Sequence, residues 1–425
     1  MKNFKKIGAI LLSVLLIGGV FAACGGNTET EGEGGNKESL DIKVGFIFLH
    51  DENSTYDKNF IDAANAACDA LGISAENRVL RVNIPENQEC YDAAADLVEQ
   101  GCNFIFADSF GHEPFMIDAA KAYPDVQFFH ATGTRAHTEN LANYHNAFAA
   151  IYDGRYLAGI AAGMKLNEMI EKGEITAEEA KIGYVGAYTY AEVISGFTSF
   201  YLGARSVCPS ATMEVTFTGT WYNYDLEQEG AVKLINNGCV LISQHADSMG
   251  APTACEQAKV PNVSYNGSTI SVGENTYIIS SRINWAPYME LAIKNTAEGK
   301  ATPADWTGTI DTESVLLTDI NTNVAADGTA EAIKAASDKI VAGELHVFDT
   351  STFTVDPAKN ATKADLIKVD ADGHLTSYMA DVDTDEAYAG DTEVVKDGYF
   401  HESEMRSAPY FDLTIDGIDL LDTAF

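Results

Sequence analysis

The stretch DIKVGFIFL at residues 41–49 decides the fold class. It is almost continuously apolar and lacks the alternation of a half-buried strand, which is typical of a strand covered on both faces of a parallel sheet. An Ala-rich helical pattern follows at residues 59–71, and a second strand is expected at residues 78–83. These three elements form one βαβ unit, so the sequence predicts a parallel sheet with helices on its faces.

The same alternation of strands and helices continues along the chain. Further helices are expected at residues 90–100 and 113–122, and further strands at residues 103–107 and 126–130. After a long helix at residues 152–170 the alternation starts again, with strands expected at 181–186, 213–217, 239–243 and 262–264 and helices at 191–207, 226–237 and 251–259. The sequence therefore predicts an α/β protein of two doubly wound parallel-sheet lobes with a ligand cleft between them.

These patterns also set the expected domain boundaries. The first lobe is placed at residues 41–145 and the second at residues 146–275. Residues 276–300, with a strand at 277–280 and a helix at 286–297, are expected to return to the first lobe, so that several crossings act as a hinge. The remaining residues, 301–425, are expected to complete the lobes, with a short helix at residues 328–342, and to end in an irregular tail.

The N-terminus has the features of an exported lipoprotein. Three lysines precede the apolar run at residues 7–20, which has the length of a signal-peptide core and is short for a membrane span. Small residues stand before Cys24 in FAAC at residues 21–24, which resembles the cleavage motif of lipoproteins. We therefore expect a signal peptide at residues 1–23, a lipid on Cys24, a flexible tether at residues 24–40 and a location on the extracytoplasmic face of the cell membrane. An ordinary cleavage site beside an incidental cysteine, or a short membrane anchor, is the alternative.

Composition limits the classes of partner and cofactor. The chain has 63 acidic and 27 basic residues, and its net charge of −36 argues against a nucleic-acid partner. Its hydrophobic content of 46% is enough to build cores in both lobes, and we expect a monomer. The cysteines besides Cys24 are widely spaced without a CxxC or Cys/His pattern. We therefore expect free thiols and neither zinc nor another cofactor, while disulfides stay open as the alternative.

The expected cleft residues follow from the parallel topology. Ligands of open α/β sheets gather at the carboxyl ends of the strands, where loops and helix N-termini converge. A wide group of polar and aromatic residues, Glu192 among them, stands at these ends. From it we select as ligand-binding residues Tyr56, Asp57, Asp108, Phe110 and His130 in the first lobe, Tyr190, Trp221, His245, Asp247 and Asn266 in the second, and Trp285 at the return crossing. Aromatic faces combined with carboxylates and amides suit a nucleoside, because rings stack on a planar base while oxygens accept hydrogen bonds from ribose hydroxyls and ring N–H groups.

Four stretches of this chain resemble the basic membrane protein (PnrA-like) lipoproteins. They are AFAAIYDGRYLAGIAAGM at residues 147–164, IGYVGA at residues 182–187, Phe197 with Gly203 and Ala204, and GTWY at residues 219–222. The resemblance covers residues 43–295 and implies a periplasmic-binding-protein-like fold in the substrate-binding component of an ABC importer. Characterised members of the family bind purine nucleosides, which implies the same class of ligand here.

The resemblance also implies roles for individual residues. Tyr56 stands at the position of the family's stacking Phe, and Trp221 at that of its partner from the second lobe. Asp57 stands at the family's Asn and is implied to bind base or sugar. His130 stands where a ribose-binding Asp is usual, and Asn266 near the Asp that meets the base edge. A structural role is the alternative for several of them: Trp221 in a core, Tyr56 at a helix cap and His130 as a buried core histidine.

An enzyme is the competing class, because histidines and carboxylates in a cleft are the ingredients of a hydrolase. The sequence has no HExxH motif, no GxSxG elbow and no Walker-type glycine loop, so we expect no catalysis. Two acidic stretches, DADG at residues 370–373 and DVDTD at residues 381–385, look like calcium loops but lack parts of that motif. We interpret them as solvated acidic faces and expect no metal site.

The expected mechanism is closure of the hinge. A small-molecule ligand, with a nucleoside favoured, binds the first lobe, and the second lobe closes over it. The closed form then docks on an ABC permease in the membrane. A receptor that presents its ligand to a membrane sensor shares these features and is the main alternative.

Overall fold

The apolar run at residues 41–49 forms β1 (Val44–Ile47), which is buried at every position in this computed structural model. The structure describes residues 40–383 and 391–422. β1 lies inside a six-stranded sheet with the order β11-β5-β4-β3-β1-β2, in which all neighbouring strands run parallel. The other strands of this first sheet are β2 (Arg78–Arg81), β3 (Phe104–Ala107), β4 (Gln127–Ala131), β5 (Tyr144–Ala149) and β11 (Asp305–Gly308).

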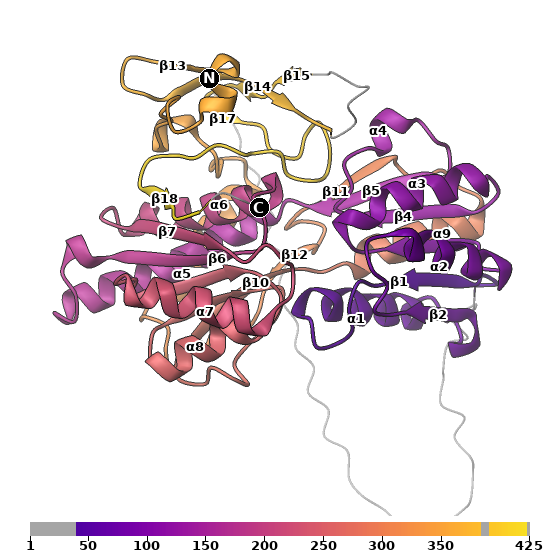
Figure 1. The fold of residues 1–425 in the computed structure, drawn as a ribbon, viewed down its shortest axis with the longest axis horizontal. Helices are drawn as coiled ribbons and strands as arrows, with labels where there is room; N and C mark the ends of the chain where they lie inside the picture. Colours follow the sequence, from indigo (N-terminus) through magenta and orange to yellow (C-terminus); the bar gives the residue numbers. More distant parts are fainter. Residues whose placement is uncertain (1–39, 384–390, 423–425) are drawn as a thin grey trace, which may run out of the picture. The chain divides into compact units, whose positions relative to one another are not determined.

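Helices cover both faces of the first sheet (Figure 1). α1 (Thr55–Ala70) and α9 (Ala286–Glu298) share a core with Val44 and Phe46 of β1. α2 (Gln88–Glu99) and α3 (Glu113–Ala122) share a separate core with Ile47, the next residue along β1. Successive side chains of a strand point to opposite faces, so a strand buried on both faces must be apolar throughout, as this run is. The short α4 (Ala136–Glu139) follows β4.

The second lobe repeats this arrangement around a seven-stranded sheet with the order β12-β10-β9-β8-β6-β7-β18. Its strands are β6 (Lys181–Gly186), β7 (Thr212–Phe217), β8 (Leu241–His245), β9 (Asn262–Tyr265), β10 (Tyr277–Ile283), β12 (Val315–Leu317) and β18 (Ile418–Leu420), of which β12 runs antiparallel to β10. α7 (Tyr224–Asn236) and α8 (Gly250–Ala258) pack on one face over their own core. α5 (Ile151–Glu171) and α6 (Ala191–Val207) belong to the larger core on the other face, which α10 (Thr329–Val341) extends.

The small residues of the 147–164 run have a packing role. α5 and α6 approach so closely that a Cβ on Gly159 would lie 2.0 Å from the backbone oxygen of Phe200. A Cβ on Gly203 of α6 would lie equally close, 2.0 Å, to the backbone oxygen of Tyr156. Larger side chains at either glycine would force the helices apart, which explains the glycine spacing of this stretch.

The structure confirms the two-lobed α/β fold but corrects the place of one strand. β10 was expected to return to the first lobe, yet it pairs with β9 in the second sheet. The connection between β9 and β10 contains no helix. The strand–helix–strand alternation of the sequence therefore does not show that β10 pairs with β9. α9 does pack on the first lobe, and β5, which begins just before the expected lobe boundary, belongs entirely to the first sheet. The chain passes between the lobes after β5, after β10 and after β11.

The C-terminal residues contain more regular structure than the expected tail. They form a three-stranded sheet of β13 (Ile367–Val369), β14 (Leu375–Asp381) and β15 (Asp391–Glu393), and a pair of β16 (Val395–Lys396) and β17 (Tyr399–Phe400). Short 3₁₀ turns lie at Ala75–Asn77, Phe110–His112, Ala177–Glu179, Thr350–Thr352 and Ala361–Leu366. β18 then joins the edge of the second sheet beside β7, so the chain end is tied to that lobe.

Several expectations concern the chain's ends and its cysteines. The expected signal peptide, Cys24 and the tether up to residue 39 lie outside the described residues. Within residues 40–383 and 391–422, no helix combines the length and the apolar character that a membrane crossing needs. Cys68, Cys90, Cys102, Cys208, Cys239 and Cys255 are buried free thiols, as predicted.

Candidate ligand-binding site

A small cavity lies between the two lobes. Its walls come from the ends of β1, β3 and β4 in the first lobe and of β6, β7 and β8 in the second, as the parallel topology predicts. The lining residues are Leu49, Tyr56, Asp57, Ser109, Phe110 and Thr132 of the first lobe and Glu192, Trp221, His245 and Asp247 of the second.

The loop after β1 folds around the carboxylate of Asp57. The backbone N–H of His50 donates to Asp57 Oδ1 at 2.7 Å, and the Ser54 hydroxyl donates to Asp57 Oδ2 at 2.6 Å. Ser54 also caps α1 by accepting a hydrogen bond from the Asp57 N–H. Burial raises the pKa of Asp57, but hydrogen bonds from His50 and Ser54 outweigh it and hold the pKa below its ordinary value. Asp57 is therefore an ionised residue that fixes the loop of its own wall.

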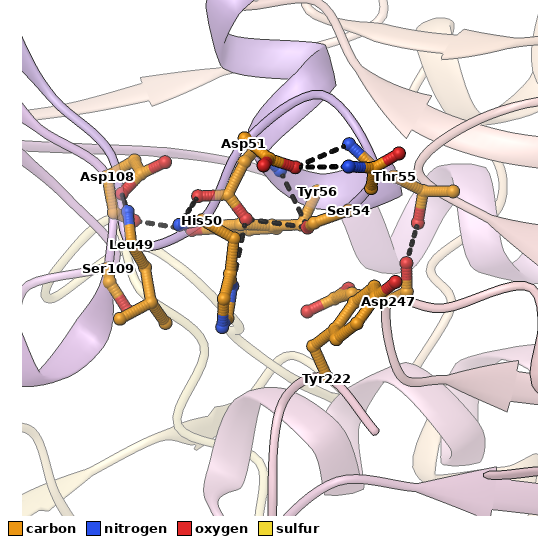
Figure 2. Close-up of polar contacts among 12 residues, drawn as sticks. Leu49, His50, Asp51, Ser54, Thr55, Tyr56, Asp108, Ser109, Tyr222 and Asp247 are labelled. Atoms are coloured by element: carbon orange, nitrogen blue, oxygen red, sulfur yellow. Dashed lines mark hydrogen bonds and ion pairs between the residues drawn. The ribbon is translucent and has the colours of Figure 1, made fainter. Parts of the chain in front are cut away.

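Tyr56 offers its ring to the cavity while its hydroxyl is tied to the protein (Figure 2). The hydroxyl donates to the backbone oxygen of Asp108 at 2.6 Å, and the ring packs on Phe60 with 4.8 Å between centroids. The Asp108 side chain is fully buried and does not line the cavity; its Oδ1 accepts from the Leu49 N–H at 3.1 Å. Burial and then the charge of Asp57 raise the pKa of Asp108 well above its ordinary value.

The loop after β4 is strained where it meets the cavity. Thr132 has φ of 71°, which is rare for a β-branched residue, and its buried hydroxyl has no hydrogen-bond partner among the described residues. Strain of this kind is often kept at ligand sites. The buried Glu113 holds the loop by accepting hydrogen bonds from the N–H groups of Thr134 and Arg135. His130 lies behind this wall, bonded through Nε2 to the Ser109 oxygen at 2.7 Å, and burial lowers its pKa.

Aromatic rings from both lobes meet beside the cavity. Trp221 packs edge-on against Tyr188 with centroids 5.0 Å apart, and Tyr188 stacks on Tyr190 at 4.9 Å. Tyr190 in turn meets Phe110 of the first lobe at 5.1 Å. This row of rings continues from one lobe to the other, and two of its members, Trp221 and Phe110, line the cavity itself.

Glu192 and His245 form a pair at the start of α6 and the end of β8. His245 Nε2 lies 3.4 Å from Glu192 Oε1, and the His245 ring meets Tyr265 edge-on at 4.6 Å. Burial lowers the pKa of His245 despite the hydrogen bond to Glu192, which favours a neutral imidazole. The Glu192 carboxylate therefore keeps acceptor capacity that faces the cavity.

Asp247 joins the lobes through its backbone and faces the cavity with its side chain. Its backbone oxygen accepts from the Thr55 N–H at 2.9 Å and from the Thr55 hydroxyl at 3.1 Å (Figure 2). Its Oδ1 accepts from Asn266 at 3.2 Å. Burial, followed by the nearby carboxylates of Glu227, Asp57 and Glu192, raises the pKa of Asp247 well above its ordinary value. Burial and these charges therefore disfavour the ionised form of Asp247.

The structure brings most of the expected residues to one place, but not all of them to the cavity. Tyr56, Asp57, Phe110, Trp221, His245 and Asp247 line it. Asp108 and His130 stand behind the first wall, Asn266 holds Asp247, and Tyr190 lies beside the cavity in the row of rings. Trp285 was wrongly placed at the cleft: it is 1% exposed and stacks on Phe60 in the core of the first lobe at 4.4 Å.

Four lining residues were not selected from the sequence: Leu49, Ser109, Thr132 and Glu192. Glu192 belonged to the wider group of polar and aromatic residues at the strand ends, after the strand at 181–186. Its position in the first turn of α6 is the sequence feature that could have identified it. No sequence feature identifies Thr132, because its place in the lining depends on a positive φ angle that only the structure reveals.

Among the described residues no group of His, Cys, Asp and Glu could hold a metal ion. Of the calcium-like stretches, Asp370 accepts hydrogen bonds from the N–H groups of Asp372 and His374 in a turn, while residues 384 and 385 lie outside the described residues.

Comparisons with known proteins agree with this geometry. A model of the Bmp family, the PnrA-like substrate-binding proteins of ABC transporters, matches residues 47–351. A putative ABC transporter glucose-binding protein of Haloferax volcanii is 30% identical over 329 residues, or 77% of this chain and 79% of that protein. A purine-binding protein of Brucella abortus is 30% identical over 250 residues, or 58% of this chain and 66% of that protein. A solved ABC transporter solute-binding protein of Aeropyrum pernix K1 has the same fold, with a TM-score of 0.62 at 16% identity over 72% of this chain and 93% of that one. The chain therefore belongs to the PnrA-like (Bmp) family of ABC transporter substrate-binding proteins.

Proposed function

We propose that this substrate-binding protein captures a purine nucleoside in the interlobe cavity and delivers it to its permease. The observation that carries the proposal is the aromatic lining from both lobes: Tyr56 and Phe110 on one side and Trp221 on the other. Rings on opposite walls suit a flat heteroaromatic base, because each stacked ring adds on the order of 1 kcal/mol beyond its burial. The tied hydroxyl of Tyr56 leaves the ring as the part that this residue offers to a ligand.

The polar lining supports a purine edge in particular. The raised pKa of Asp247 favours a carboxylic acid, which places one donor and one acceptor side by side. A purine edge presents the complementary pair, an N–H or amino group next to a ring nitrogen or oxygen. Glu192 adds an ionisable acceptor from the same lobe. The purine-binding relative from Brucella abortus supports the same class of ligand.

The contacts between the lobes support hinge closure as the mechanism. Thr55 of the first lobe donates to the Asp247 oxygen of the second, and Phe110 meets Tyr190 across the same gap. These contacts require both lobes to be close together, so a ligand that binds both walls stabilises the closed arrangement over an open one. The permease would then select the closed form.

The glucose-binding name of the Haloferax volcanii relative makes a sugar the rival ligand. The experiment is isothermal titration calorimetry on protein refolded to remove carried-over ligand, with adenosine, guanosine, adenine and D-glucose. We expect the purine nucleosides to bind and D-glucose not to bind. Binding of D-glucose alone would overturn the proposal, and chromatography of the recovered nucleoside would reveal any turnover.

Trp221→Ala tests the stacking wall directly. We expect it to weaken nucleoside binding by about 2 kcal/mol, or about thirtyfold in Kd, because both stacking and buried contact are lost. Tyr224→Ala is the matched control, since that ring is 39% exposed at the start of α7 and lies outside the cavity. Equal affinities in the two variants would remove Trp221 from the site.

We also propose that the chain is anchored through a lipid on Cys24 at the extracytoplasmic face of the membrane. The lipobox-like FAAC at residues 21–24 and the low-complexity stretch after it support this anchor. A single acyl chain anchors only marginally, so a di- or triacylated cysteine is required. Cys24→Ser should move the protein from the membrane fraction to the soluble fraction with unchanged ligand affinity. Retention of the variant in the membrane fraction would contradict the anchor.

A further inference from the structure

A second, more open cavity adjoins the interlobe cavity and shares Phe110, Thr132 and Glu192 with it. We call it the side cavity. Thr134 of the first lobe and Tyr190 and Ala191 of the second also line it, and Arg406, Ala408 and Pro409 of the C-terminal segment complete its wall. These last three residues lie beyond residues 47–351, which match the family model. The C-terminal segment therefore adds a third wall next to the ligand cavity.

This third wall is fastened to both lobes. The Ser407 N–H donates to Asp305 Oδ1 of the first lobe at 2.9 Å. Glu402 accepts a hydrogen bond from Ser195 of α6 in the second lobe at 3.1 Å and from the Phe411 N–H at 2.9 Å. The loop that carries Arg406 is thus held in place on either side of the cleft, as a binding wall must be.

Arg406 has donor capacity that the protein does not use. The side chain is 6% exposed, its Nε donates to the Ala408 oxygen at 3.1 Å, and its Nη2 donates to the Pro409 oxygen at 3.0 Å. Nη1 is buried and has no hydrogen-bond partner among the described residues. A buried donor without a partner is costly, so an acceptor supplied by a ligand at this wall would be favourable.

The surroundings of Arg406 favour a neutral acceptor over a phosphate. Carboxylates of Glu402, Asp381, Glu113 and Asp305 act on the guanidinium, and Glu192 stands on the lining that the two cavities share. A dianionic group here would face these carboxylates as well as the arginine. A hydroxyl is better matched, because it accepts from a guanidinium and donates to a carboxylate at once.

We propose that the side cavity holds the sugar of the bound nucleoside, with Arg406 donating to a sugar oxygen and Glu192 accepting from a sugar hydroxyl. The inference rests on the proposed nucleoside function, and it deepens that function by assigning the base to the aromatic interlobe cavity and the sugar to the side cavity. The C-terminal segment thereby becomes a specificity element that separates nucleosides from free bases.

The test compares adenosine, adenine and adenosine 5′-monophosphate by calorimetry on the full chain and on Arg406→Gln. We expect the variant to bind adenosine about tenfold more weakly, because a hydrogen bond to a charged group is lost, with adenine affinity unchanged. Arg205→Gln is the matched control: that arginine also ties the C-terminal segment, through Asp416 and the Thr352 oxygen, but it does not line the side cavity. It should leave both affinities unchanged.

Ala408→Leu gives a second route that does not depend on the arginine. Ala408 is 4% exposed and lines the side cavity, so the larger side chain fills the proposed sugar space and should also weaken adenosine but not adenine. Equal losses for adenosine and adenine in both variants would overturn the sugar site and leave the base site standing. Tighter binding of adenosine 5′-monophosphate than of adenosine, lost in Arg406→Gln, would replace the sugar site by a phosphate site. If the wild-type chain binds neither adenosine nor adenine, the proposed function itself fails.

Discussion

The two walls of the interlobe cavity differ in how their polar groups are used. On the first-lobe wall, Asp57 accepts hydrogen bonds from His50 and Ser54, and the Tyr56 hydroxyl is bonded to the Asp108 oxygen. On the second-lobe wall, Asp247 has only Asn266 as a side-chain partner, and Glu192 has only His245, at 3.4 Å, among the described residues. The polar groups of the first wall therefore hold its own loop in place, whereas the carboxyl groups of Asp247 and Glu192 on the second wall have few partners in the protein and face the cavity.

This difference predicts a structural role for Asp57 and a ligand-binding role for Asp247, although the two residues look alike in the sequence. Both Asp57 and Asp247 are buried carboxyl groups that follow a parallel strand. Their pKa values nevertheless shift in opposite directions, because hydrogen bonds to the charged form outweigh burial at Asp57, whereas burial and neighbouring carboxylates act together at Asp247. We expect a change at the first wall to cost stability and a change at the second to cost affinity.

Asp57→Ala should give the largest effect. The variant leaves the His50 N–H and the Ser54 hydroxyl without their buried acceptor, so we expect the free energy of unfolding to fall by about 3 kcal/mol in urea denaturation at neutral pH. The lowered pKa gives the sign of the pH dependence: the stabilisation by Asp57 is present above the ordinary carboxyl pKa and disappears as the pH falls through the lowered value. The difference between wild type and variant should therefore shrink in acid.

Asp62→Ala is the matched control on the same helix. Asp62 pairs with Lys58 at the surface, with side chains 60% and 51% exposed, so its loss should change the unfolding free energy by less than about 0.5 kcal/mol. If Asp57→Ala is as mild as Asp62→Ala, the first wall is not held by its carboxylate and the contrast between the walls fails.

The fold was largely predictable because burial on both faces leaves a strong pattern. The apolar run of β1 and the helices that follow it could be placed from the sequence, since most strands of the two lobes are followed by a helix. β10 could not be placed, because no helix precedes it and periodicity does not say which sheet a strand joins. The strands of the C-terminal residues are short and depend on pairing partners that are far away in the chain.

The location of the candidate site could be predicted from the sequence, but the contacts that each side chain makes there could not. The rule that ligands gather at strand ends was enough to select Tyr56 and Trp221, which reach the cavity from different lobes. The same rule selected Trp285, because its strand was assigned to the wrong place and its burial against Phe60 could not be known. Arg406, which we propose to contribute to the site, lies about 160 residues beyond the end of β8, the last strand whose end lines the cavity, and no local pattern points to it.

Asp247→Asn should give a smaller effect, confined to ligand binding and its pH dependence. The raised pKa favours a protonated Asp247 that donates to the ligand, so the affinity of the wild-type protein should be constant below that pKa and fall as the pH rises through it. An asparagine also offers one donor and one acceptor and does not titrate. We therefore expect the variant to bind within about threefold of wild type at pH 6 and to lose the decline on the alkaline side, as followed by calorimetry.

The outcome at Asp247 also depends on the opposite wall. The ionised Asp57 is one of the charges that raise the pKa of Asp247, after burial and Glu227, so the charge of the first wall disfavours ionisation of Asp247 on the second. Glu227, whose own pKa burial raises to about 7, is the first of these charges, and Glu227→Gln removes it at a residue that does not itself line the cavity. It should shift the decline in affinity to lower pH, because Asp247 then ionises more easily. An affinity that instead increases with pH would mean that the ligand binds the ionised carboxylate, and the second wall would then recognise donors only.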